Sequence, residues 1–189
     1  EEIPKAIAVI DPKQPGCDYP FKGLAAVGLV AKTAQALMGE LDEETFDLVA
    51  IGTVADMAPL RSENRVFVKK GLSLIANSRN PGLRALLDVS RVDVKKLTPY
   101  HIGFILGPRI NAAGRMDPAH TSLDLFLCED TKQAYELARA LENHNSDRQR
   151  MQKGIIEEAI DLIESDALKK EQKVIVLGKE GWHKGIVGI

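Results

Sequence analysis

The sequence FDLVAIGTV, residues 46–54, decides which fold class the chain is expected to adopt. Its apolar residues form an almost continuous run, which is typical of a strand covered on both faces in a parallel sheet. A similar run, AIAVI at residues 6–10, ends at Asp11 and Pro12. A third, KVIVLG at residues 173–178, follows much later. We therefore predict buried strands at these three places.

Helical periodicity is evident between the first two runs and after them. Apolar residues recur at helical spacing over residues 22–38 and 65–77, and shorter helices are predicted over residues 81–88 and from Pro99. Thr98 is a good N-cap for the last of these, with proline at the first helical position. An alternation of strand and helix predicts an α/β fold built on a parallel sheet.

One helix is predicted to be much longer than the others. It covers about residues 131–168 and is preceded by Asp130, a favourable N-cap. At 1.5 Å per residue such a helix extends roughly 60 Å, far more than one small domain needs. We therefore expect it to connect two domains.

The composition is that of an ordinary soluble globular protein, with 44% hydrophobic and 28% charged residues and a net charge of −2. Binding of nucleic acid would have to come from a local basic cluster, since there is no global basic field. Cys17 and Cys128 have no metal-ligand spacing and indicate a reducing cytoplasm. No apolar run approaches the roughly 20 residues of a membrane span. The chain lacks an initial methionine and ends in an apolar, glycine-rich stretch, so we expect a segment of a longer protein.

The stretch GPRINAAGRM, residues 107–116, is predicted to be a compact loop. Its glycines allow tight turns, and its two alanines leave room for a ligand. Arg109, Asn111 and Arg115 would offer several donors at once, which suits an anionic, oxygen-rich ligand such as a phosphate. The alternative is a solvated loop whose arginines pair with surface carboxylates.

Asp56 follows the predicted strand at residues 46–54. Ligands of open α/β sheets gather beyond the carboxyl ends of the strands, so this carboxylate is a candidate site residue. The alternative is that Asp56 caps a turn before Pro59.

The long helix carries polar residues where core residues are expected. Its apolar stripe includes Leu141, and Asn145, Arg148 and Gln152 continue that stripe at helical spacing. We expect this face to border a wet cleft, and the alternative is a helix that bridges solvent between domains. His183, beside Trp182, is a weaker candidate for a binding turn.

Five stretches, taken in order, resemble the RecJ-type single-strand-specific exonucleases of the DHH phosphoesterase superfamily. The resemblance covers nearly the whole chain, and five ordered motifs are far more specific than any one. The stretches are QPGCDYPFKGLAAVG, GTVADMAPL, GPRINAAGRM, ENHNSDRQR and GWHKGIVGI.

The resemblance implies a two-domain architecture. Residues 1–130 would be the C-terminal part of the α/β DHH domain, and residues 131–170 the long connecting helix. Residues 171–189 would begin a second, truncated α/β domain of the DHHA1 type, with DNA running through the cleft between the domains.

The resemblance also implies a chemistry and roles for residues. Such enzymes use Mn²⁺ or Mg²⁺ to hydrolyse single-stranded DNA from the 5′ end, in DNA recombination and repair. Asp56 would be a metal ligand, and Asp56, Arg109 and Asn111 would be the catalytic residues. The expected substrate-binding residues are Arg109, Asn111, Arg115, Asn145, Arg148 and His183.

The Asp-His-His signature of the superfamily is absent from this chain. Most ligands of the metal pair would therefore lie upstream, and the chain alone is expected to be inactive. The implied partners are single-stranded DNA, a single-strand-binding protein and a helicase, and the implied state is a cytoplasmic monomer without membrane contact. Two alternatives are a non-catalytic replication scaffold and a DHH phosphodiesterase that cleaves short oligonucleotides or cyclic dinucleotides.

Overall fold

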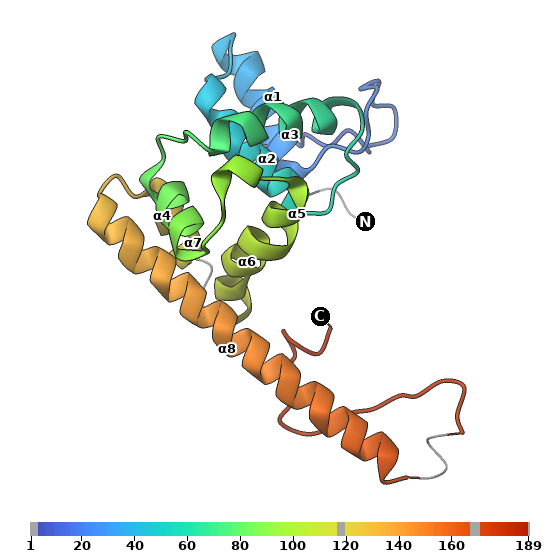
Figure 1. The fold of residues 1–189 in the computed structure, drawn as a ribbon. Coiled ribbons are helices and arrows are strands. Elements are labelled where there is room, and N and C mark those ends of the chain that lie inside the picture. Colours follow the sequence, from blue (N-terminus) through green and yellow to red (C-terminus); the bar gives the residue numbers. More distant parts are fainter. Residues whose placement is uncertain (1–3, 117–119, 167–170, 189) are drawn as a thin grey trace.

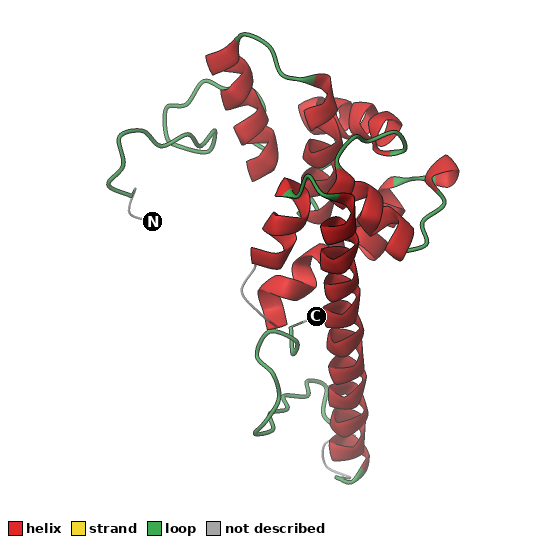
Figure 2. Ribbon diagram, turned by 90° about the vertical axis from the view of Figure 1, so that its left-hand side faces the viewer, coloured by secondary structure: helices red, strands yellow, loops and turns green. Residues whose placement is uncertain are grey.

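The computed structural model describes residues 4–116, 120–166 and 171–188 (Figure 1). All regular structure within these ranges is helical, and no strand occurs in them (Figure 2). The predicted α/β fold with a parallel sheet is therefore wrong for this chain. Residues 6–10 and 173–178 have no regular structure, and residues 46–54 lie in helix α2 (Phe46–Ala55).

Residues 46–54, which were predicted to be a strand, lie in a helix that other helices cover on several sides. A continuous apolar run does not distinguish a buried strand from a buried helix, because neither shows a polar face. Helix α2 contacts α1, α3, η3 and α6, and its buried residues include Val49, Ala50 and Ile51. An added Cβ at Gly71 would overlap the carbonyl of Phe46, so the close approach of α3 to α2 depends on glycine.

The first group of helices packs around α2. It comprises α1 (Ala26–Met38), η1 (Glu43–Thr45), α2 and α3 (Ser62–Ile75). Helices α1 and α3 confirm the predictions made from helical periodicity at residues 22–38 and 65–77. Leu24, Ala31, Val49 and Phe67 form the shared core of this group.

The second group packs against the first half of the long helix through α4, α6 and α7. Its members are α4 (Pro81–Val89), η2 (Val94–Lys96), α5 (Pro99–His101), η3 (Ile102–Leu106), α6 (Gly107–Met116) and α7 (His120–Leu127). The helices predicted over residues 81–88 and from Pro99 are confirmed. A second core, which includes Leu83, Leu86, Ile102, Leu106 and Leu141, joins this group to the long helix.

GPRINAAGRM forms helix α6, so the prediction of a compact loop is wrong. Helical geometry runs without a break from Pro99 through α5 and η3 into α6. Gly107 has φ −54° and ψ −48°, and an added Cβ there would lie 3.3 Å from the Cβ of Ala55. This glycine therefore allows α6 to approach α2 closely and does not make a turn, while Ala112 is fully buried.

The long helix α8 (Thr131–Glu164) confirms the prediction of an unusually long helix. The carboxylate of Asp130 accepts a hydrogen bond from the backbone N–H of Gln133 at 2.7 Å and caps its first turn. Its 34 residues extend about 50 Å, well beyond the helical body, and the C-terminal segment lies along its far half (Figure 1). No helix in the described ranges is both long and apolar enough to cross a membrane.

Candidate nucleic-acid site

Asp56 and Asn111 meet in one pocket although they lie far apart in the sequence. The pocket has a volume of about 350 Å³ and lies between α2, α6 and α7. Asp56 is the exposed C-cap of α2, not the residue after a strand, and Asn111 is an exposed residue of α6. The lining residues are Leu48, Ile51, Gly52, Ala55, Asp56, Ile110, Asn111 and Phe126.

The position of Asp56 favours a cation nearby. A helix carries a partial negative charge at its C-terminus, so a carboxylate at the C-cap is electrostatically unfavourable there. A bound cation would neutralise the carboxylate and offset the negative end of the α2 dipole. The pocket therefore combines one poorly placed negative charge with the amide oxygen of Asn111.

These two side chains supply only part of a metal site. Mg²⁺ and similar divalent cations prefer about six oxygen ligands. Among the described residues, no group of three or more His, Cys, Asp or Glu side chains is arranged to hold a metal ion. The described chain therefore offers one carboxylate and one amide oxygen, and it does not complete a site by itself.

Arg109 lies on the other side of α6 from Asn111, because residues two apart on a helix do not face each other. Its Nε donates to one carboxylate oxygen of Glu142 on α8, and its Nη2 donates to the other at 3.3 Å. Its Nη1 donates to the carbonyl of Ile105 at 2.7 Å. The structure thus separates Arg109 from the Asp56 pocket, which the expected compact loop would not have done.

Sequence reasoning missed Glu142. A signal was present, since Glu142 lies three residues before Asn145 and so shares its face of α8. The charge of Glu142 made it look like an ordinary solvated position, and only the packing of α6 on α8 identifies its partner.

Asn145 and Arg148 are buried, as their spacing along the predicted helix indicates. Their exposed fractions are 1% and 9%. Arg148 donates through Nε and Nη2 to Oδ1 of Asn145 at 3.3 and 3.2 Å, and through Nη1 to Oε1 of Gln152 at 3.0 Å. The three residues form a polar row along α8, continuing the line that begins at Glu142.

His183 belongs to a separate pocket on the far half of α8, with a volume of about 380 Å³. Next to it, Trp182 donates through Nε1 to Glu158 at 2.8 Å, and Lys179 pairs with Glu158 at 3.0 Å. These two bonds lower the pKa of the Glu158 carboxyl. Arg115 lies in α6, but its side chain is outside the described residues.

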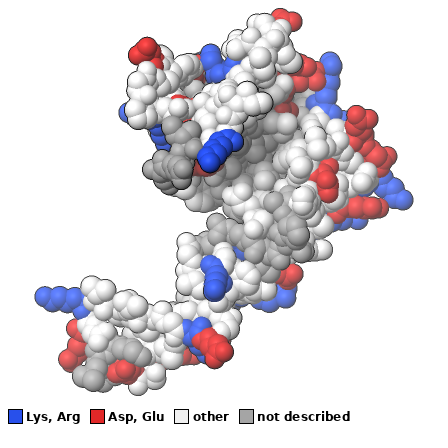
Figure 3. All heavy atoms as spheres, turned by 180° about the vertical axis from the view of Figure 1, so that it is seen from behind, with Lys and Arg blue, Asp and Glu red and all other residues white. Residues whose placement is uncertain are grey.

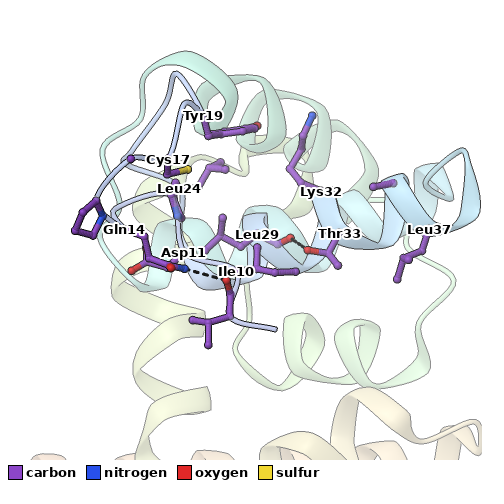
Figure 4. Close-up of a pocket in the computed structure, with 15 residues that line it drawn as sticks. Ile10, Asp11, Gln14, Cys17, Tyr19, Leu24, Leu29, Lys32, Thr33 and Leu37 are labelled. Carbon is purple, nitrogen blue, oxygen red and sulfur yellow. Dashed lines mark hydrogen bonds between the residues drawn. The ribbon is translucent and has the colours of Figure 1, made fainter. Parts of the chain in front are cut away.

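A hydrogen-bonded cluster fastens the loop before α1 to α3. The hydroxyl of Tyr19 donates to Oε2 of Glu63 at 2.5 Å, and Lys32 pairs with Oε1 of Glu63 at 3.1 Å. Tyr19 and Lys32 lie at the edge of a pocket of about 780 Å³ between this loop and α1 (Figure 4). Burial and the bond to Glu63 raise the pKa of Tyr19 to about 12. Burial raises the pKa of Glu63, but the bonds from Tyr19 and Lys32 outweigh it, and the net pKa is lowered.

We expect Tyr19→Phe to destabilise the chain at neutral pH by about 1 kcal/mol, the usual net value of a hydrogen bond. A raised folded-state pKa means that the contribution is complete below the ordinary pKa of 10.0 and is lost as the pH rises through about 12. Urea denaturation of both proteins should show a difference that shrinks over this range. Tyr100→Phe is the control, because Tyr100 is 62% exposed. An unchanged difference at high pH would contradict the assignment.

Known proteins are similar to this chain over its whole length. No family model matches the chain. All of it aligns with single-stranded-DNA-specific exonuclease RecJ of Bacillus subtilis, at 43% identity over 188 residues and 24% of that protein's length. It aligns over its whole length with RecJ of Escherichia coli as well, at 37% identity and 36% of that length.

Two solved structures share the architecture. A crystal structure of exonuclease RecJ bound to manganese superposes with a TM-score of 0.72 at 33% identity, over 86% of this chain and 40% of that one. A crystal structure of RecJ from Thermus thermophilus in complex with Mn²⁺ gives 0.73 at 30% identity, over 92% and 26%.

The chain therefore shares its helical scaffold with a class of exonucleases whose solved structures contain Mn²⁺ or Mg²⁺. Within that class, the chain belongs to the RecJ family. It spans between about a quarter and about a third of the length of these curated relatives.

Proposed function

We propose that the chain is part of a metal-dependent exonuclease that hydrolyses single-stranded DNA from the 5′ end, in recombination and repair. The observation that carries the proposal is the match of the whole chain to RecJ exonucleases at up to 43% identity. The pocket that joins Asp56 to Asn111 supports it, because the family resemblance assigns both residues to one active site and the pocket brings them together.

In this proposal Asp56 is one ligand of a two-metal site, and most of the other ligands lie upstream of this chain. When bound, such metals activate a water and stabilise the oxygens of the phosphate under attack. Asn111 lies beside Asp56 and would hold an oxygen of the substrate through its amide. Arg109, Arg115 and His183 would bind the strand on either side of this point, and the buried Asn145 and Arg148 would support this surface from α8.

The proposed arrangement assigns residues 1–130 to part of one domain, residues 131–170 to a connecting helix and residues 171–189 to the start of a second domain. The continuous helix α8 and the separate pocket at His183 support this division. The strand would then run from the Asp56 pocket along the polar row of α8 toward His183.

The chain would bind the DNA strand through a few individual basic side chains and not through a general positive charge. The net charge is −2, and acidic and basic side chains are mixed on the face seen in Figure 3. Affinity would therefore come from a few arginine–phosphate contacts, which release counterions and depend on salt. Base-specific contacts would be few, as in other proteins that follow a single-strand backbone.

The test uses the longer enzyme that contains this chain, with Mn²⁺ and a DNA strand labelled at either end. We expect digestion of single strands from the 5′ end, loss of activity with a chelator, and little activity on blunt duplex. With about four phosphate contacts, single-strand affinity should fall about 50-fold between roughly 50 and 200 mM salt.

Three outcomes would contradict this proposal. Binding without hydrolysis would indicate a scaffold, and faster hydrolysis of dinucleotides than of long strands would indicate a phosphodiesterase. Binding that is insensitive to salt would exclude the phosphate contacts. Four further features stay predictions from the family resemblance: a cytoplasmic location, a monomeric state, and contacts with a single-strand-binding protein and with a helicase.

A further inference from the structure

The guanidinium of Arg109 is bound along one edge. Glu142 accepts from Nε and Nη2, the pair of donors on the side of the group, and the carbonyl of Ile105 accepts from Nη1. Arginine has five N–H donors, in a fixed planar fork. The contacts among described residues therefore use three of them, and one N–H each on Nη1 and Nη2 is left for another acceptor.

The carboxylate of Glu142 is well placed to define the orientation of the Arg109 guanidinium. Glu142 projects from α8 and Arg109 from α6, two helices that pack directly on each other. The side chains are 31% and 16% exposed, so the pair is partly shielded from water. A two-point contact between a planar guanidinium and a carboxylate restricts rotation of the guanidinium plane.

We propose that Glu142 is a positioning residue for Arg109. It holds the side edge of the guanidinium, so that the two remaining N–H groups are presented together to two oxygens of a DNA phosphate. The inference rests on the proposed function, in which Arg109 contacts the strand. It assigns a role to a residue that carries the wrong charge for binding DNA itself.

The inference separates turnover from affinity. Removing Glu142 deletes a negative charge near the DNA path, so electrostatics should leave binding unchanged or make it tighter. The freed Arg109 would no longer be held in one orientation, and misplacement of a group that aligns the substrate lowers turnover by about 10- to 100-fold. A residue with a merely structural role would not produce this split between kcat and affinity.

The experiment measures kcat and single-strand Kd in the longer enzyme, with thermal unfolding to check the fold. We expect Glu142→Ala to lower kcat at least about 10-fold with Kd unchanged or reduced. In an Arg109→Ala background the same change should cause no further loss, because the two residues act as one unit. Glu142→Gln keeps the volume and one acceptor, and should fall between wild type and Glu142→Ala. Glu136→Ala, on an exposed position of the same helix, is the control and should have no effect.

A folded Glu142→Ala or Glu142→Gln enzyme with unchanged kcat would overturn the inference, as would losses that add to those of Arg109→Ala. The proposed function fails differently. In that case the wild-type enzyme does not hydrolyse single strands, or Arg109→Ala alone has no effect.

Discussion

Replacing Asp56 with asparagine in the longer enzyme should reduce kcat about 10³-fold, the scale seen when one preorganised charge-stabilising group is removed. The substitution keeps the volume and removes the charge. Asp56 is exposed at the C-cap of α2, where a carboxylate is unfavourable without a cation, so its loss should not destabilise the fold. Single-strand binding should change little, because the arginines carry it.

Digestion of a labelled single strand, together with a binding titration, checks both halves of this prediction. Asp161→Asn, on an exposed position of α8, is the matched control and should be neutral. The 189-residue chain alone should bind Mn²⁺ weakly by calorimetry and show no hydrolysis, because the described residues that line its pocket provide one carboxylate. Near-normal turnover by the Asp56→Asn enzyme, or tight two-site Mn²⁺ binding by the chain, would exclude Asp56 as a ligand.

Arg148→Leu should lower the free energy of unfolding by about 2 to 3 kcal/mol. The buried amide oxygen of Asn145 would lose the two N–H groups that Arg148 donates to it, and the half-buried Gln152 would lose one more bond; an unsatisfied buried acceptor costs about 1–3 kcal/mol. From the sequence alone, leucine would restore a continuous apolar stripe, so stability would change little or rise while activity falls. The burial of Asn145, 1% exposed, reverses that expectation.

Urea denaturation of three proteins tests this prediction. Arg150→Leu is the control, because its side chain is 80% exposed and pairs with Asp147 one turn away, at 3.2 Å. It should cost less than about 0.5 kcal/mol. Arg148→Lys should be intermediate, since lysine keeps the charge but not the fork. Equal stability of Arg148→Leu and wild type would show that the polar row does not stabilise α8.

The local helix signals were reliable. Thr98 before Pro99 and Asp130 before the long helix mark helix starts that the structure contains. Such caps act over a single turn, so they can be recognised without knowledge of the rest of the fold.

The strand prediction at residues 46–54 failed for a different physical reason, whereas the other two predicted strands, at residues 6–10 and 173–178, have no regular structure and expose most of their large apolar side chains. A run such as residues 46–54 indicates burial, but both a strand and a helix can be buried on several sides. The length of α2, 10 residues, does not decide between them, because long strands and short helices both reach this length. The secondary structure of GPRINAAGRM was ambiguous for a related reason. Glycine and arginine occur in loops, but they also occur in a helix that packs closely against its neighbours.

The sequence by itself determined the family, the long helix and the inward position of Asn145 and Arg148, because motif order and helical period are properties of the linear chain. Tertiary structure alone decided that Asp56 meets Asn111 and that Arg109 meets Glu142. The helical period specifies which residues share a face within one helix. Partners across helices depend on how the helices pack, and close contacts such as those at Gly71 and Gly107 determine that packing.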